Sequence, residues 1–292
     1  MKKIVVTGCG QLGSKVVEDA SKKFEVVVVD KAVMNLTGNK FYQIDITDKG
    51  KIAEVIEKFN PSCVIHTAAI VDVDFCEENK DLAWKVNVEG TRNIAEICRK
   101  NDIKMVYFST DFIFDGKMGD YREDDKPNPL SVYGRTKLEG EEAVKSGCSD
   151  YLICRTAVPY GLNPAKKSNF GLWVIEKLKN NEKINVFTDQ INSPTFIDDF
   201  SMALSKLIEI NASGTYNVTG SEAISRYEFA RKVVKIFGFD EDLVNPIISD
   251  QLRQKAQRPK NASLNIDKIT KLGIKMSNIE EGLTKLKSQM VG

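Results

Sequence analysis

Histidine is almost absent from this sequence, since His66 is the only one among 292 residues. A mechanism that needs two histidines is therefore excluded, and a metal site built from histidine ligands is not expected. The six cysteines form neither a C-x-x-C pair nor a zinc-ribbon spacing. We therefore predict no metal site. His66 follows the apolar residues Cys63 to Ile65 and is expected to have a structural role at the end of a strand.

Long apolar runs are missing as well. No stretch approaches the length that spans a membrane, and the apolar core near the start is too short for a signal peptide. We therefore expect a cytoplasmic protein with reduced, mostly buried cysteines. Neither sign of charge dominates, because 42 Lys and Arg face 41 Asp and Glu. This balance gives no reason to expect nucleic acid or a membrane as partner, and it favours a small-molecule substrate.

What the sequence does contain is an alternation of short apolar runs with amphipathic stretches. Strands are predicted at 3–7, 24–29, 62–66, 104–109 and 151–155, with helices after the first strand, at 51–59 and at 82–100. Strands that alternate with helices favour a parallel sheet that helices cover on both faces. The predicted fold class is therefore α/β, with a doubly wound parallel sheet.

A glycine motif lies between the first predicted strand and the first predicted helix. Gly8, Gly10 and Gly13 make the pattern GxGxxG, and Asp30 closes the next strand. The glycines permit a tight turn and a close approach of the backbone to a pyrophosphate, which the helix N-terminus attracts. Asp30 is suited to bind the ribose hydroxyls and repels a 2′-phosphate. We therefore predict NAD(H) or NADP(H), with NAD(H) slightly favoured because Lys31 offsets part of the repulsion.

The alternation lapses after Pro159, where glycine, asparagine and proline mark loops. We expect residues 1–158 to form a dinucleotide-binding domain of Rossmann type. Residues 159–292 are expected to form mainly a smaller substrate-binding lobe, with elements near 170–185 and 212–220 returning to the main domain. A helix is predicted near 226–237, with Ser225 as its N-cap.

The stretch from Ser109 to Lys137 carries the candidate chemistry. If Tyr133 opens a helix, Lys137 stands one turn later on the same face. A cation beside a phenol stabilises the phenolate by roughly 3 kcal/mol at about 5 Å and an effective dielectric near 20, which corresponds to about two pKa units. A tyrosine tuned in this way can protonate a substrate oxygen, as a carbonyl reduction requires. The pattern alone is also typical of a surface tyrosine beside a solvated lysine.

Several segments together resemble the extended short-chain dehydrogenase/reductases, and among these the dTDP-4-dehydrorhamnose reductase family most closely. The resemblance spans nearly the whole chain and is carried by GCGQLG, DITD, HTAAIVDVDFCEENKDLAWKVNVEGTRNIA, STDFIFDG, SVYGRTKLEGE, RTAVPYG, DQINSPTF, GTYNVTGSEAISRYEFA and RPKNASLN. It implies a Rossmann-type sheet with a smaller, interleaved C-terminal substrate lobe. The implied activity is the NAD(P)H-dependent reduction of a nucleotide-linked 4-keto-6-deoxysugar, a step of dTDP-L-rhamnose synthesis.

The resemblance also implies roles for individual residues. Thr110 is expected to hydrogen-bond the C4 carbonyl of the sugar, Tyr133 to act as the acid, and Lys137 to tune it and hold the nicotinamide ribose. The residues expected to bind the cofactor are Gly8, Gly10, Gln11, Leu12, Gly13, Asp30, Asp45, Ile46, Ala68, Ala69, Asn87, Tyr133 and Lys137. Those expected to bind substrate are Asp111, Val158, Asn169, Thr195 and Arg258. Arg258 is the expected pyrophosphate partner, because a guanidinium binds such oxygens bidentately.

The chain departs from the family pattern at two places. Val158 stands where the family usually has a tryptophan beside the sugar. Ser14 and Lys15 stand where members that dimerise through magnesium carry acids, so we predict no metal there. A homodimer is still compatible with the resemblance.

Two other functions remain open from the sequence. One is a nucleotide-sugar epimerase or dehydratase of the same superfamily. The other is a cofactor-binding subunit without catalysis, because the regulatory subunit of eukaryotic methionine adenosyltransferase resembles the same family, including segments like YREDDKPNPLSVYGRTKLEGEEAV.

Overall fold

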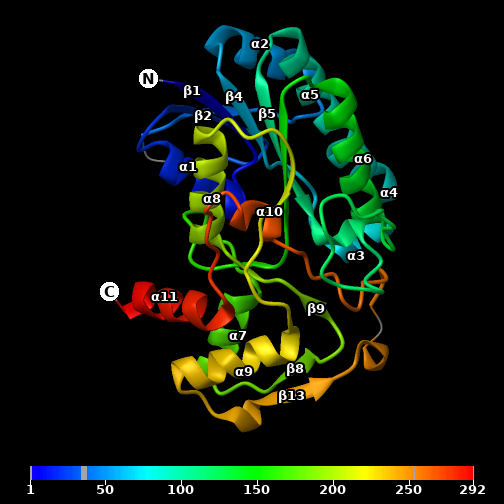
Figure 1. The fold of residues 1–292 in the computed structure, drawn as a ribbon, viewed down its shortest axis with the longest axis vertical. Coiled ribbons are helices and arrows are strands. Elements are labelled where there is room, and N and C mark those ends of the chain that lie inside the picture. The colour runs from blue at the N-terminus through cyan, green and yellow to red at the C-terminus, as the bar shows by residue number, and fades with distance from the viewer. Residues whose placement is uncertain (1, 34–37, 253, 292) are drawn as a thin grey trace.

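The fold is built on one parallel sheet, seen in the computed structural model (Figure 1), which describes residues 2–33, 38–252 and 254–291. Its seven strands lie in the order β11-β6-β5-β4-β1-β2-β3, and every neighbouring pair is parallel. They are β1 (Lys3–Thr7), β2 (Glu25–Asp30), β3 (Lys40–Gln43), β4 (Cys63–His66), β5 (Lys104–Thr110), β6 (Tyr151–Thr156) and β11 (Gly214–Asn217). The predicted fold class is confirmed.

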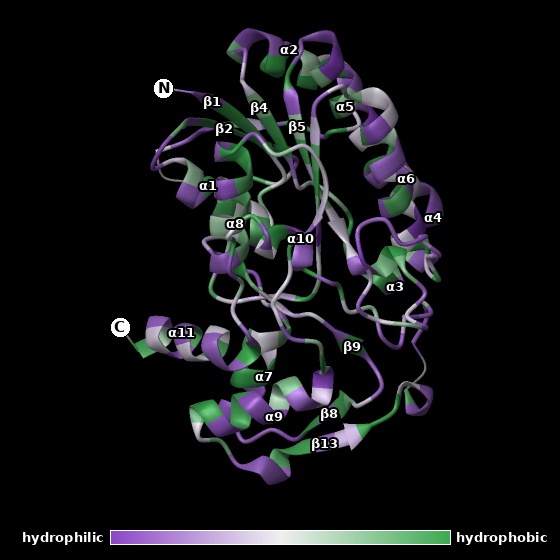
Figure 2. Ribbon diagram, viewed as in Figure 1, coloured by the Kyte–Doolittle hydropathy of each residue, from purple (hydrophilic) through white to green (hydrophobic). Residues whose placement is uncertain are grey.

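Helices cover both faces of this sheet. One face carries α1 (Gln11–Ala20), α8 (Ile197–Glu209) and the short α10 (Asp267–Thr270), and the other carries α2 (Lys49–Phe59), α5 (Thr91–Lys100) and α6 (Val132–Gly147). Figure 2 shows α2, α5 and α6 with mixed hydrophilic and hydrophobic residues, as expected for amphipathic helices that cover a sheet. The inner strands β1, β2 and β4 are nearly continuous apolar runs, because both of their faces are buried.

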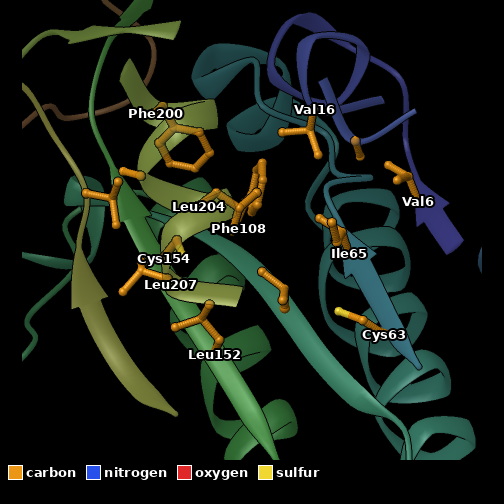
Figure 3. Close-up of a cluster of buried hydrophobic side chains, with 14 of the residues drawn as sticks. Val6, Val16, Cys63, Ile65, Phe108, Leu152, Cys154, Phe200, Leu204 and Leu207 are labelled. Atoms are coloured by element: carbon orange, nitrogen blue, oxygen red, sulfur yellow. The ribbon is translucent and has the colours of Figure 1, made fainter. Parts of the chain in front are cut away.

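Successive residues of a strand belong to different cores. Ile4 and Val6 of β1 lie in the cluster that includes Val16 of α1 and Leu204 of α8, whereas Val5 lies in the cluster that faces α2 and α5. Figure 3 shows the first cluster, where side chains of the sheet meet those of α8. Each fully buried side chain of this kind contributes about 1.5–3 kcal/mol.

A smaller lobe lies at the carboxyl ends of the strands. It contains β7 (Pro159–Tyr160), α7 (Phe170–Lys179), β8 (Ile184–Phe187), β9 (Ile191–Asn192), β10 (Thr195–Phe196), β12 (Ile224–Ser225), α9 (Arg226–Phe237), β13 (Val244–Ile247) and α11 (Ile279–Val291). These strands form pairs: β10 with β7 and β13 with β8 in parallel, and β12 with β9 antiparallel. Helix α9 begins as predicted, because Ser225 caps it and forms a capping box with Glu228.

Two segments were expected to return to the main domain, and they pack in different parts of the structure. Residues 212–220 include β11, which pairs with β6 at the edge of the large sheet. Residues 170–185 instead form α7 and the start of β8, whose apolar faces pack against α9 in the core of the smaller lobe. Helix α8 lies on the large sheet beside α1, because its apolar face matches the sheet. The division of the chain near residue 158 stays a prediction.

The short helices α3 (Val73–Glu78) and α4 (Lys80–Trp84) precede a π-helical turn, Lys85–Gly90, that leads into α5. Among the residues that the structure describes, 3-10 turns occur at Asp111–Ile113, Glu241–Leu243 and Ser249–Gln251. The six cysteines are free and buried. Within the described ranges, no helix combines the length and hydropathy needed to cross a bilayer.

Candidate active site

A cleft of about 610 Å³ opens at the carboxyl ends of the central strands. The strand order reverses between β1 and β4, and this switch point is where open α/β sheets bind ligands. Residues 159, 167, 169, 170 and 226 of the smaller lobe line the cleft as well. The cleft therefore lies between the two parts of the chain that were expected to bind cofactor and substrate.

The glycine motif forms one end of the cleft. Gly8 has φ +86°, and a Cβ there would lie 2.4 Å from the Ala68 nitrogen; a Cβ on Gly13 would lie 2.3 Å from the Gly8 oxygen. Gly10 faces open space and is the N-cap of α1, without a side chain to cap it. The first N–H groups of α1 are thus available to an anion. These features fit the pyrophosphate of a dinucleotide.

Two acids flank this end. Asp30 accepts hydrogen bonds from the backbone nitrogens of Cys9 (2.6 Å) and Ala32 (2.8 Å), which hold its carboxylate at the cleft wall. Asp45 accepts from the nitrogen and hydroxyl of Thr47, both at 2.9 Å, and lines the cleft with Ile46. Gln11, Leu12, Ala68 and Ala69 complete the lining that was expected around a cofactor.

Thr110, Tyr133 and Lys137 line the same cleft. Thr110 ends β5, and its oxygen accepts a hydrogen bond from the nitrogen of Phe112 (3.2 Å). Helix α6 begins at Val132, one residue before Tyr133, because the hydroxyl of Ser131 accepts a hydrogen bond from the Gly134 nitrogen. Tyr133 and Lys137 therefore stand one turn apart on one face, as the sequence predicts.

The acidity of Tyr133 differs from the expectation. Burial raises the pKa of Tyr133, and a hydrogen bond with Thr110 opposes this only in part. Burial also lowers the pKa of Lys137 to about 7, although Glu141 opposes the shift. Lys137 is therefore only partly charged at neutral pH, and its Nζ lies 4.1 Å from the centre of the Tyr107 ring. The predicted lowering of the Tyr133 pKa is wrong for the protein by itself; its phenol is neutral, the form that donates a proton.

Three expected site residues do not line the cleft. Asn87 binds the backbone of Ile70 through both atoms of its amide (2.8 and 3.0 Å), so it braces the loop after β4. Thr195 is fully buried and lies 3.2 Å from the hydroxyl of Thr156. Arg258 forms a bidentate ion pair with Asp74 of α3, with both distances 3.0 Å. The roles expected of these three residues stay predictions, since none of the three lines the cleft.

The expected substrate residues Asp111, Val158 and Asn169 do line the cleft. Asp111 is buried and binds the amide of Asn192 (2.5 Å) and the hydroxyl of Thr110 (3.1 Å). Burial raises the pKa of Asp111 to about 6 despite these hydrogen bonds.

Arg226 and Phe170 line the cleft and were not predicted from the sequence. One local clue to Arg226 was present. It is the first residue of α9, where the helix dipole favours an acid over a base. A residue that breaks a local rule is often one with a functional reason.

Beneath the cleft floor lies the single histidine. Nδ1 of His66 is 2.6 Å from the hydroxyl of Thr7, and Nε2 is 3.0 Å from that of Thr91. Its ring also stacks on Tyr107. Burial, with a smaller contribution from Lys137, lowers the pKa of His66 from 6.5 to about 3. The structure supports the predicted structural role at the end of β4.

Acid is expected to destabilise the fold through His66. Between pH 6.5 and 3 the unfolded chain binds a proton at this position that the folded chain does not, so stability falls as pH falls through this window. At pH 4 the loss is about 3 kcal/mol relative to pH 7. Urea unfolding of wild type and His66→Gln at both pH values checks this. The Gln variant should lose that part of the pH dependence, and equal pH dependence in both proteins would rule the mechanism out.

The sequence and the fold are both similar to those of known proteins. The family model described as the RmlD substrate binding domain matches residues 1–291. The dTDP-4-dehydrorhamnose reductase of Aggregatibacter actinomycetemcomitans is 31% identical, over 99% of each chain. The methionine adenosyltransferase 2 subunit beta of Bos taurus is 31% identical, over 80% of this chain and 72% of its own. The structure of a dTDP-4-dehydrorhamnose reductase from Bacillus anthracis in complex with NADP has a TM-score of 0.90 and 32% identity, and the match covers 99% of this chain and 100% of that one.

Proposed function

The chain belongs to the family of the RmlD substrate binding domain, and on that premise we propose that it is a nicotinamide-dependent reductase of a nucleotide-linked 4-keto-6-deoxysugar. The activity is that of a dTDP-4-dehydrorhamnose reductase, the name of relatives that match over nearly the whole chain. One observation carries the proposal: Thr110, Tyr133 and Lys137 share a cleft with the glycine motif and Asp30.

The reaction divides between the cofactor and the chain. A reduced nicotinamide held by the glycine motif and Asp30 would supply the hydride for this reduction. The hydroxyl of Thr110 orients the C4 carbonyl by a hydrogen bond, and the neutral phenol of Tyr133 donates a proton to its oxygen. Lys137 holds the ribose and stabilises the phenolate as it forms. Because burial lowers the pKa of Lys137 to about 7, this stabilisation is strongest below pH 7, where Lys137 is charged.

Asp30 supports a preference for NADH over NADPH. Its carboxylate is held at the cleft wall by two backbone N–H groups, so it cannot easily turn away from a 2′-phosphate. Lys31 also lines the cleft and reduces the repulsion. The expected preference is therefore small.

Incubation of the purified protein with dTDP-4-keto-6-deoxysugars tests the proposal. Loss of the reduced-nicotinamide absorbance is expected, somewhat faster with NADH than with NADPH. If none of these sugars causes oxidation of NADH or NADPH, the proposal is wrong. Tightly retained NAD⁺ without net consumption would instead favour an epimerase or dehydratase.

A second candidate is a cofactor-binding subunit without catalysis, which the similarity to methionine adenosyltransferase 2 subunit beta supports. This function predicts co-purification with a synthetase and a biological effect that does not depend on Tyr133. The cytoplasmic location and the homodimer stay predictions, which cell fractionation and sedimentation test.

A further inference from the structure

Arg226 occupies the substrate end of the cleft. It is the first residue of α9 and lines the cleft together with Thr110, Asp111 and Phe170. The centre of its guanidinium lies 4.6 Å from the centre of the Phe170 ring, so an aromatic face supports the cation. The side chain is thus held against the Phe170 wall of the cleft.

The charge of Arg226 is not neutralised by an ion pair. Asp111 attracts it electrostatically, but that carboxylate is bound to Asn192 and Thr110. No carboxylate of the described ranges forms an ion pair with Arg226, whereas Arg258 is paired with Asp74. Burial lowers the pKa of Arg226 to about 10, so it remains a cation at neutral pH.

Two further effects make this position unfavourable for a cation. The N-terminus of α9 is the positive end of its dipole. Arg258 is also close enough to repel Arg226. This cation is partly buried, unpaired and near a second arginine. An anion with several oxygens that binds in the cleft would therefore stabilise it.

We propose that Arg226 is the cleft-facing arginine that binds the diphosphate of the nucleotide-sugar. The inference rests on the proposed function, which supplies a diphosphate on C1, across the sugar ring from the C4 carbonyl at Thr110. The family resemblance assigns the diphosphate to Arg258 instead. In this structure, however, Arg258 is paired with Asp74 and so joins its own segment to α3. Arg258 is thus engaged by Asp74 outside the cleft lining, whereas Arg226 lines the cleft and is available to the ligand.

Binding measurements test this without turnover. Isothermal titration calorimetry with dTDP and with UDP, at constant ionic strength, compares wild type with Arg226→Gln and Arg226→Lys. The Gln variant is expected to raise Kd at least tenfold, and the Lys variant severalfold, because an ammonium replaces a bidentate guanidinium. Arg231→Gln is the matched control. It removes the same charge from the same helix at an exposed position paired with Glu241, and Kd should not change.

Equal Kd values in wild type and Arg226→Gln overturn the inference, as does a wild type that binds neither nucleotide. Thermal melting and titration with NADH check that each variant is folded. If the Gln variant does not fold, an unchanged Kd in the Lys variant overturns the inference. The two proposals can fail separately. Diphosphate binding through Arg226 without sugar reduction removes only the proposed function, and sugar reduction with an unchanged KM in Arg226→Gln removes only the role of Arg226.

Discussion

Replacement of Tyr133 by phenylalanine is expected to lower kcat by about 10²- to 10⁴-fold, the usual contribution of a general acid. The change removes one hydroxyl and keeps the buried ring, which packs edge-on against Phe112. The cofactor should therefore bind almost as before. Steady-state kinetics and titration with NADH measure the two effects separately.

The control for this variant is Tyr42→Phe, which removes the same hydroxyl from a tyrosine of β3 outside the cleft lining. Its kcat should equal that of the wild type. A Tyr133→Phe variant that lost cofactor binding as strongly as turnover would contradict the division of labour between Tyr133 and Lys137. A variant with wild-type kcat would show that another group donates the proton.

Replacement of Lys137 by methionine is expected to abolish most activity while stabilising the fold. Methionine keeps the length and apolar stem, but it cannot hold a ribose or a phenolate, so both kcat and cofactor affinity should fall by at least about tenfold each. Glu141 stays satisfied in this variant, because Arg155 binds both of its oxygens (2.9 and 2.8 Å).

The gain in stability follows from the sign of the pKa shift. Burial lowers the pKa of Lys137 from 10.5 to about 7, so between these values the unfolded chain binds a proton that the folded chain lacks. The stability of the wild type therefore rises with pH through this window. At pH 7, burial of this ionisable group lowers the free energy of unfolding by on the order of 4 kcal/mol. The methionine variant avoids this loss, because its side chain does not ionise.

Urea unfolding between pH 7 and 10 measures this effect. The Lys137→Met variant should unfold at higher urea at pH 7, and its stability should depend less on pH than that of the wild type. Lys51→Met, at an exposed position of α2, serves as the control and should follow the wild type. Parallel pH profiles for wild type and Lys137→Met would contradict the predicted cost. The expected pattern is one in which a buried functional charge is retained at the expense of stability.

Much of the fold was visible in local patterns. The apolar runs of β1, β2 and β4 alternate with helical periodicity, and this alternation requires no knowledge of distant residues. The glycine motif and Asp30 are equally local, because a turn that needs φ +86° at Gly8 and a Cβ-free approach at Gly13 leaves little choice of residue. The spacing of Tyr133 and Lys137 follows from one turn of helix.

The packing partners of α7 and α8 were not visible in this way. Both segments are amphipathic helices of similar length, and periodicity reports an apolar face without naming its partner. Packing decided that α8 covers the sheet beside α1 and that α7 covers α9. The positions of Asn87, Thr195 and Arg258 outside the cleft lining were not visible in the sequence for a related reason, since their hydrogen-bond partners come from remote parts of the chain.

The sequence by itself thus determined the sheet, the glycine cradle and the order of Thr110, Tyr133 and Lys137, because each depends on neighbours within one or two turns or strands. Only the tertiary structure decided in which direction the pKa values of Tyr133 and Lys137 shift, and which arginine faces the cleft. A pKa depends on burial, and burial of Tyr133 and Lys137 comes from segments far apart in the chain. The orientation of the Arg226 side chain likewise depends on Phe170, and that of Arg258 on Asp74. Each partner lies near its arginine only after folding.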